Sequence, residues 1–202
     1  MTTTTIHFVR HGTVHNPTNI FYGRIPRFGL SSLGIQQASN LHSFFSGRPV
    51  SRIFSSPQLR ARQTAGIIAK SFNKIDISIN SKIAEIRSPY DGHPIPEMIE
   101  RNWDIYTGNQ PPFELPMDVF NRTYSFIKGI LRSYRGKQVI AVTHADLILF
   151  VTLWGYGHEI SYNNKFMVEH NMMDIQFPSP ASVTTCTWED DDVKPNIEYL
   201  DS

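Results

Sequence analysis

Two runs of β-branched or apolar residues, each followed by a motif with a histidine, constrain this chain more than any other feature. One run leads into Val9-Arg10-His11-Gly12 near the start, and another leads into Val142-Thr143-His144-Ala145 far downstream. In an α/β protein the carboxyl ends of parallel strands meet at one edge of the sheet, where the loops that follow them build a site. The two runs therefore predict that His11 and His144 lie in one site, together with Arg10.

Length and composition favour one domain without a large polyanionic partner. The 202 residues fit a single domain, 1–202, with enough chain for a core. A formal net charge of +1 gives no electrostatic reason to expect binding to nucleic acid. No apolar run reaches the ~20 residues of a membrane span. The single cysteine, Cys186, and an N-terminus without a signal-peptide pattern lead us to expect a cytoplasmic protein.

Strand and helix patterns alternate along most of the chain. We expect strands at residues 4–9, 53–55, 75–79 and 139–143. We expect helices from Ser31 or Ser32 to residue 45, and at 57–70, 117–134 and 145–154. This alternation predicts an α/β fold: a three-layer α/β/α single domain whose central sheet is mostly parallel.

The end of the chain departs from that alternation. Segments near 173–177 and 182–188, separated by Pro178-Ser179-Pro180, predict a hairpin. Its open edge is a candidate surface for a homodimer. The acidic run 189–192 is typical of a solvated turn.

Residues 86–116, called the lid segment from here on, form an irregular insertion. The segment is rich in Pro, Asn, Asp and Trp and has no sustained period, apart from a short helix expected around 97–103. Long segments of this kind are often active-site covers. The lid segment is therefore expected to contact the substrate.

Two further residues have the chemistry that an anion site needs. Arg60 falls in the first turn of an expected helix, where free N–H groups and a guanidinium both attract phosphate. Glu85 opens the lid segment, and partial burial there is expected to raise its pKa and suit it to proton transfer. Taken alone, Arg60 is better interpreted as an exposed helix arginine, and Glu85 as an ordinary surface glutamate.

A metal hydrolase that uses His11, His144 and Asp146 is a second interpretation, because histidine and carboxylate are common metal ligands. Arg10 beside His11 argues against it, since a fixed cation disfavours a dication nearby. Full activity after exhaustive chelation would exclude it.

Five separate runs of the sequence resemble the histidine phosphatase superfamily, in its branch of small phosphatases. The runs are Val9 to Thr13; Leu30-Ser31 with Gly34, Gln37 and Ala38; Ser55 to Ala65; Ala84-Glu85-Ile86; and Val142 to Ala145. They cover nearly the whole chain in the family's order and spacing. The resemblance implies a phosphoglycerate-mutase-like fold.

The resemblance also implies a role for each central residue. His11 is the expected nucleophile, and Arg10, Arg60 and His144 are expected to bind the phosphate oxygens. Glu85 is expected to protonate the leaving oxygen and then to activate water. The scheme needs no metal and no cofactor. Since His11 must present an unprotonated nitrogen, its other nitrogen is expected to donate to a backbone carbonyl.

The same resemblance marks five expected substrate-binding positions: Thr13, Asn16, Gly23, Arg24 and Ala145. Asn16 falls one residue earlier than the asparagine usual in the family. Ala145 stands where the family commonly has glycine, which keeps a backbone N–H but allows less close approach.

These features predict a metal-independent phosphomonoester hydrolase that forms a phosphohistidine on a small phosphorylated metabolite. The lid segment holds two arginines against five acidic residues, which favours hydrolysis over a mutase that must bind a second anionic group. A mutase-type phosphotransferase and a non-catalytic protein that binds phosphorylated ligands remain the alternatives. Tyr90, Trp103 and Tyr106 either stack on the leaving group or pack on their own domain.

Overall fold

A mixed sheet of six strands in the order β3-β2-β4-β1-β5-β6 runs through the middle of the protein. The computed structural model describes residues 2–189 and 193–201. The strands are β1 (Thr3–Arg10), β2 (Val50–Ser55), β3 (Ile77–Ile79), β4 (Gln138–Thr143), β5 (Val183–Glu189) and β6 (Asn196–Leu200). The β2–β3, β2–β4 and β1–β4 pairs are parallel, whereas β5 runs antiparallel to β1 and to β6.

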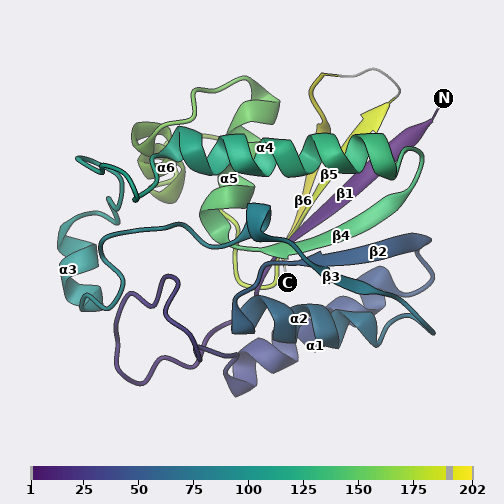
Figure 1. The fold of residues 1–202 in the computed structure, drawn as a ribbon, viewed down its shortest axis with the longest axis horizontal. Helices are drawn as coiled ribbons and strands as arrows, with labels where there is room; N and C mark the ends of the chain where they lie inside the picture. Colours follow the sequence, from purple (N-terminus) through teal and green to yellow (C-terminus); the bar gives the residue numbers. More distant parts are fainter. Residues whose placement is uncertain (1, 190–192, 202) are drawn as a thin grey trace.

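Helices cover both faces of this sheet (Figure 1). They are α1 (Ser32–Phe45), α2 (Leu59–Ala69), α3 (Ile95–Glu100), α4 (Pro116–Ser133), α5 (Ala145–Tyr156) and α6 (Tyr162–Glu169), with one 3₁₀ turn at Ser81–Ile83. Helices α1 and α2 lie below the sheet in Figure 1, and α4, α5 and α6 lie above it. The three-layer α/β architecture expected from the sequence is therefore confirmed.

The sheet separates two apolar clusters, because its central strands bury side chains on both faces. Ile6 and Phe8 of β1 join the larger cluster with α4 and α5, while Val9 joins the smaller cluster with α1 and α2. Ser31 caps α1 by accepting the Gly34 N–H through its side chain. The core thus holds the strand ends in fixed positions.

Four details differ from the sequence-based expectations. Pro57 precedes the Gln58 cap and lies outside α2. The short helix of the lid segment is α3, which ends before Asn102 and Trp103, because both residues adopt positive φ. Residues 173–177 form no strand, since both edges of β5 are already paired with β1 and β6. Helix α6 has no counterpart in the prediction.

The hairpin, the homodimer and the acidic turn expected near the C-terminus have different outcomes. The hairpin is β5–β6 instead, and β6 is an edge strand, so the predicted homodimer remains a prediction. Of the acidic run, Glu189 ends β5 and residues 190–192 lie outside the described residues. No helix within residues 2–189 and 193–201 combines the length and apolar character that membrane crossing requires.

Candidate active site

The site lies where β1 and β4 end side by side. The parallel register pairs Arg10 with Thr143, and the backbone N–H of His11 donates to the Thr143 carbonyl at 3.1 Å. The next residue on each chain segment is a histidine, and the rings of His11 and His144 lie 5.2 Å apart. The structure therefore places both histidines in one site, as the sequence pattern predicts.

The ring of His11 is buried and fixed at both nitrogens. Nδ1 lies 2.8 Å from the Gly12 carbonyl oxygen, and Nε2 accepts the Nε–H of Arg60 at 3.1 Å. Burial, assisted by the Arg60 charge, holds the pKa of His11 well below its usual range. The ring is thus neutral, with its proton on Nδ1 and the lone pair of Nε2 facing the site. The expected donation to a backbone carbonyl is present.

Arg60 connects the other polar groups of the site. It sits in the first turn of α2 and is fully buried. Besides His11, its guanidinium donates to the Gly23 carbonyl at 2.8 Å and to Oε2 of Glu85 at 2.9 Å. The guanidinium also lies over the ring of Tyr22, 4.7 Å from its centre. Its guanidinium therefore joins His11, Gly23 and Glu85 in one network.

The pKa of Glu85 is shifted in the opposite direction to the sequence-based expectation. Burial raises it, but His144 and Arg60, both 2.9 Å from Oε2, outweigh burial and hold the pKa well below its usual range. The Ile86 backbone N–H adds a hydrogen bond to Oε1 at 2.9 Å. The expectation of a raised pKa was wrong, because the sequence does not reveal which cations lie against the carboxylate.

Hydrogen bonds around His144 place a mobile proton between its ring and Glu85. The 2.9 Å contact between Nδ1 and Oε2 of Glu85 needs one hydrogen between the two atoms. On the other side, Nε2 lies 2.7 Å from Oγ of Ser56. Oε1 of Gln58 accepts the Glu85 backbone N–H and lies 2.5 Å from the same Oγ, so it takes the Ser56 hydroxyl hydrogen. Nε2 of His144 must then donate to Ser56.

The consequence is a pair that holds one labile proton, shared by Nδ1 of His144 and Oε2 of Glu85. Burial lowers the pKa of His144 below its usual range, and the charge of Glu85 opposes this effect. The pair keeps the proton that its 2.9 Å contact requires, and the ring gives this proton up readily. Ser56 and Gln58 set the arrangement, and sequence reasoning assigned them no role. Their place in the run from Ser55 to Ala65 was the available signal.

Arg10 enters the site from the end of β1. One of its terminal nitrogens donates to the Pro178 carbonyl at 2.6 Å. Its Nε is buried and has no hydrogen-bond partner within the described part of the chain. A buried donor left unpaired costs roughly 1–3 kcal/mol, which a bound phosphate oxygen would recover.

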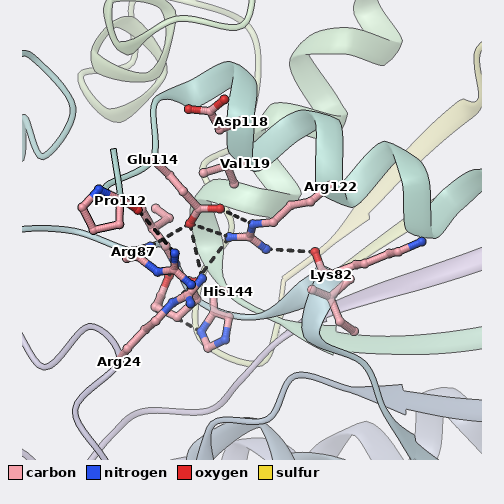
Figure 2. A network of polar contacts seen from close by, with 12 residues as sticks. Arg24, Lys82, Arg87, Pro112, Glu114, Asp118, Val119, Arg122 and His144 are labelled. Carbon is pink, nitrogen blue, oxygen red and sulfur yellow. Dashed lines mark hydrogen bonds and ion pairs between the residues drawn. The ribbon is translucent and has the colours of Figure 1, made fainter. Parts of the chain in front are cut away.

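A second network joins Arg24, Arg122 and Glu114 (Figure 2), and its two arginines also hold the backbone at Glu85. The Glu85 carbonyl accepts Nε of Arg24 at 2.7 Å and a terminal nitrogen of Arg122 at 3.3 Å. Both arginines also pair with Glu114, whose carboxylate accepts the Arg87 backbone N–H as well. Arg24 is not among the residues that line the cavity, and its expected contact with substrate stays a prediction. Sequence reasoning missed Glu114 and Arg122 as site residues.

The remaining expected substrate contacts divide into two groups. Gly23 and Ala145 line the cavity beside His11. Asn16 bonds the backbone of Ile20 through both ends of its amide, and Thr13 bonds Gln37 through its backbone N–H. Asn16 and Thr13 therefore shape the loop after β1 and do not line the cavity.

A cavity of about 300 Å³ opens from this site toward the lid segment and α6. Arg10, His11 and Glu85 form one end of it. Its wall is mostly apolar and consists of Ile20, Phe21, Ile86, Ile95, Trp103, Ile105 and Phe177. The space is large enough for the leaving group of a small phosphate ester.

His11, Glu85 and His144 also form the one cluster of metal-ligand type among the described residues, with donor atoms within 4.8 Å of one another. Arg60 donates to His11 and Glu85 and lies 3.4 Å from Nδ1 of His144. A buried guanidinium thus occupies the space that a dication would need. Asp146 is not in the cluster, and its carboxylate accepts the Tyr106 hydroxyl at 2.7 Å.

Comparison with known proteins agrees with the fold. The family model of the histidine phosphatase superfamily (branch 1) matches residues 6–194. An uncharacterised protein of Mycobacterium tuberculosis is 47% identical over 66 residues, a stretch that spans 33% of this chain and 33% of that protein. The 5''-phosphoribostamycin phosphatase of Niallia circulans is 28% identical over 174 residues, covering 78% of this chain and 79% of the relative.

Solved structures have the same fold. The structure of Bacillus stearothermophilus YhfR superposes with a TM-score of 0.78 at 20% identity, covering 96% of this chain and 95% of that chain. This likeness concerns the fold, and the phosphatase relatives support a phosphatase function. On its motifs, its fold and the match over residues 6–194, the chain belongs to the histidine phosphatase superfamily.

Proposed function

We propose that this protein is a metal-independent phosphomonoester hydrolase that acts on a small phosphorylated metabolite through a phosphohistidine at His11. One observation carries the proposal: His11 is neutral, its Nδ1–H is held by the Gly12 carbonyl, and its Nε2 faces the guanidinium of Arg60. A nucleophilic nitrogen and a phosphate-binding cation thus share one small space.

In the first step Nε2 of His11 attacks phosphorus and the ester P–O bond breaks. Arg10 and Arg60 bind the phosphate oxygens and stabilise the charge that develops on them. The proton held between Glu85 and His144 moves to the leaving oxygen, so the alcohol departs neutral.

In the second step water attacks the same phosphorus and the N–P bond breaks. Glu85 accepts the water proton, phosphate leaves, and His11 regains its lone pair. Arginine charge serves here in place of a metal, because Arg60 already contacts every member of the candidate metal cluster.

Hydrolysis of p-nitrophenyl phosphate in EDTA between pH 5 and 8 tests this proposal. Wild type is expected to turn over without metal. His11→Ala is expected to lose activity by about a thousandfold or more while staying folded, because it removes the nucleophile. His158→Ala, at an exposed histidine, is the matched control. Activity that requires an added metal, or that survives in His11→Ala, would contradict the mechanism.

A further inference from the structure

Where α5 and α6 line the cavity, they contribute three charged side chains: Asp146, Lys165 and Glu169. Asp146 belongs to the first turn of α5, and the other two to α6. Two carboxylates and one ammonium give this part of the cavity a net charge of −1. The leaving group of a substrate bound at His11 would extend into this part of the cavity.

Lys165 does not provide a free cation there. Its side chain is buried, and Nζ donates to both carboxylate oxygens of Glu169 at 2.8 and 2.9 Å and to the Trp103 carbonyl at 3.4 Å. An ammonium group has three N–H donors, so these contacts use all of them. Among the residues that line the cavity, Arg10 is the other cation, and it lies at the phosphate end.

The side wall offers an apolar surface and one strained aromatic residue. Trp103 lines the cavity with φ at 56°, directly after Asn102 with φ at 51°. A bulky residue in this region costs roughly 1–3 kcal/mol and usually persists where function needs it. The bond from its N–H to the Met98 carbonyl at 2.8 Å and the contact with Lys165 hold it there.

Of the other three aromatic residues of the lid segment, Phe113 does not line the cavity, and Tyr90 and Tyr106 pack on the protein itself. Tyr90 contacts Arg101, and Tyr106 is buried with its hydroxyl on Asp146. Trp103 is therefore the lid aromatic that a leaving group would meet.

We propose that the phosphomonoester accepted by this site has a largely apolar leaving group that is uncharged or cationic, and that it has no second anionic group. The inference rests on the proposed function and refines it. A carboxylate or second phosphate on the leaving group would enter a site of like charge whose lysine is already neutralised. An ammonium or hydroxyl group would find an acceptor in Asp146.

Three aryl phosphates that differ only at the far end test the inference: 4-propylphenyl, 4-(2-aminoethyl)phenyl and 4-(2-carboxyethyl)phenyl phosphate. Their phenols are similar leaving groups, so the comparison isolates the distal charge. We expect kcat/KM for the carboxylate ester to be about tenfold or more below that of the neutral ester. We expect kcat/KM for the ammonium ester to equal or exceed that of the neutral ester.

Glu169→Gln provides the reverse test, because it frees the charge of Lys165. The kcat/KM of the carboxylate ester should rise at least about threefold relative to that of the neutral ester. Glu159→Gln, the same substitution at an exposed position outside the cavity, should leave the ratio as in wild type.

The outcomes separate the two proposals. Hydrolysis of the neutral ester with an equal or better rate for the carboxylate ester overturns the inference alone, as does an unchanged ratio in a folded Glu169→Gln protein. Failure to hydrolyse any of the three esters would overturn the proposed function and this inference with it.

Discussion

At the scale of single residues, two histidines only a few ångströms apart are prepared for different tasks. His11 bonds a backbone carbonyl and Arg60, which leaves its Nε2 unprotonated. His144 bonds Glu85 and Ser56, which gives each of its nitrogens a hydrogen-bond partner. Environments that shift the pKa values of neighbouring titratable groups away from each other are typical of acid–base sites. The difference between nucleophile and proton donor is thus visible in the partners of each ring.

Glu85→Gln tests the proton-transfer step. Because p-nitrophenolate departs without a proton, kcat for the aryl ester should fall about tenfold or less, and kcat for an alkyl ester should fall about a hundredfold or more. Steady-state kinetics on the two esters give the ratio. Glu97→Gln, in the exposed part of the lid segment, is the control. Equal losses on both esters would argue against a role in proton transfer.

Gln58→Leu tests the positioning role of the Gln58–Ser56 contact. Without its acceptor, the Ser56 hydroxyl should turn toward Nε2 of His144, and the pair with Glu85 should lose its labile proton. The optimum for alkyl phosphates should then move to lower pH, with kcat at pH 7 down about tenfold. The pH profile should not change for p-nitrophenyl phosphate.

A purely structural defect in Gln58→Leu would lower kcat for both esters alike at every pH. Gln36→Leu, on the exposed face of α1, controls for the substitution itself.

The five residues that the sequence predicts for the site lie together in the structure, but the sequence does not give the protonation state of each. His11, Arg60, Glu85 and His144 are in contact as the motifs suggest. The direction of the Glu85 pKa shift was missed, because it depends on two cations that arrive from other parts of the chain. The role of Ser56 was missed because it rests on a single hydroxyl hydrogen.

At the scale of elements, predictability follows the strength of the local pattern. Buried strands such as β1 and β4 are rich in β-branched and apolar residues and were placed to within two residues. Residues 173–177 alternate like a strand, yet no sheet edge is open to them. Helix α6 has three of its apolar residues in one run, Phe166 to Val168, so its helical pattern is weak. The failures are therefore at places where tertiary contacts decide the outcome.

Glu114→Gln tests whether the network between the lid segment and α4 positions Glu85. Losing this carboxylate charge leaves Arg24 and Arg122 poorly paired, which should lower the free energy of unfolding by about 2 kcal/mol. The segment at Glu85 should loosen, so kcat should fall several-fold while KM stays nearly constant. Denaturant unfolding and steady-state kinetics measure the two effects.

Asp118→Asn, on the same helix, preserves an acceptor for the Leu115 N–H and is the matched control. An unchanged kcat in a folded Glu114→Gln protein would show that the network serves stability alone.

At the scale of the whole molecule, stability should depend on pH through buried neutral histidines. His7 lies between Thr185 and Gln138, and burial lowers its pKa to about 4 from a usual value of 6.5. Between these values the unfolded chain binds more protons than the folded one, so stability falls as pH falls. From pH 7 to pH 5 each such histidine should remove about 2 kcal/mol.

His7→Leu should flatten this dependence by about that amount, and His158→Leu, at an exposed histidine, should not. Urea unfolding at intervals between pH 5 and 7 gives both slopes. A wild-type slope identical to that of His7→Leu would show that His7 is not held neutral by the fold.

The central claim concerns a covalent intermediate, and the configuration at phosphorus tests it most directly. An aryl phosphorothioate made chiral at phosphorus with oxygen isotopes would be hydrolysed in isotopically labelled water with EDTA present. Two in-line displacements, first by His11 and then by water, predict net retention of configuration. Net inversion would mean that water attacks the ester directly, and it would contradict the account.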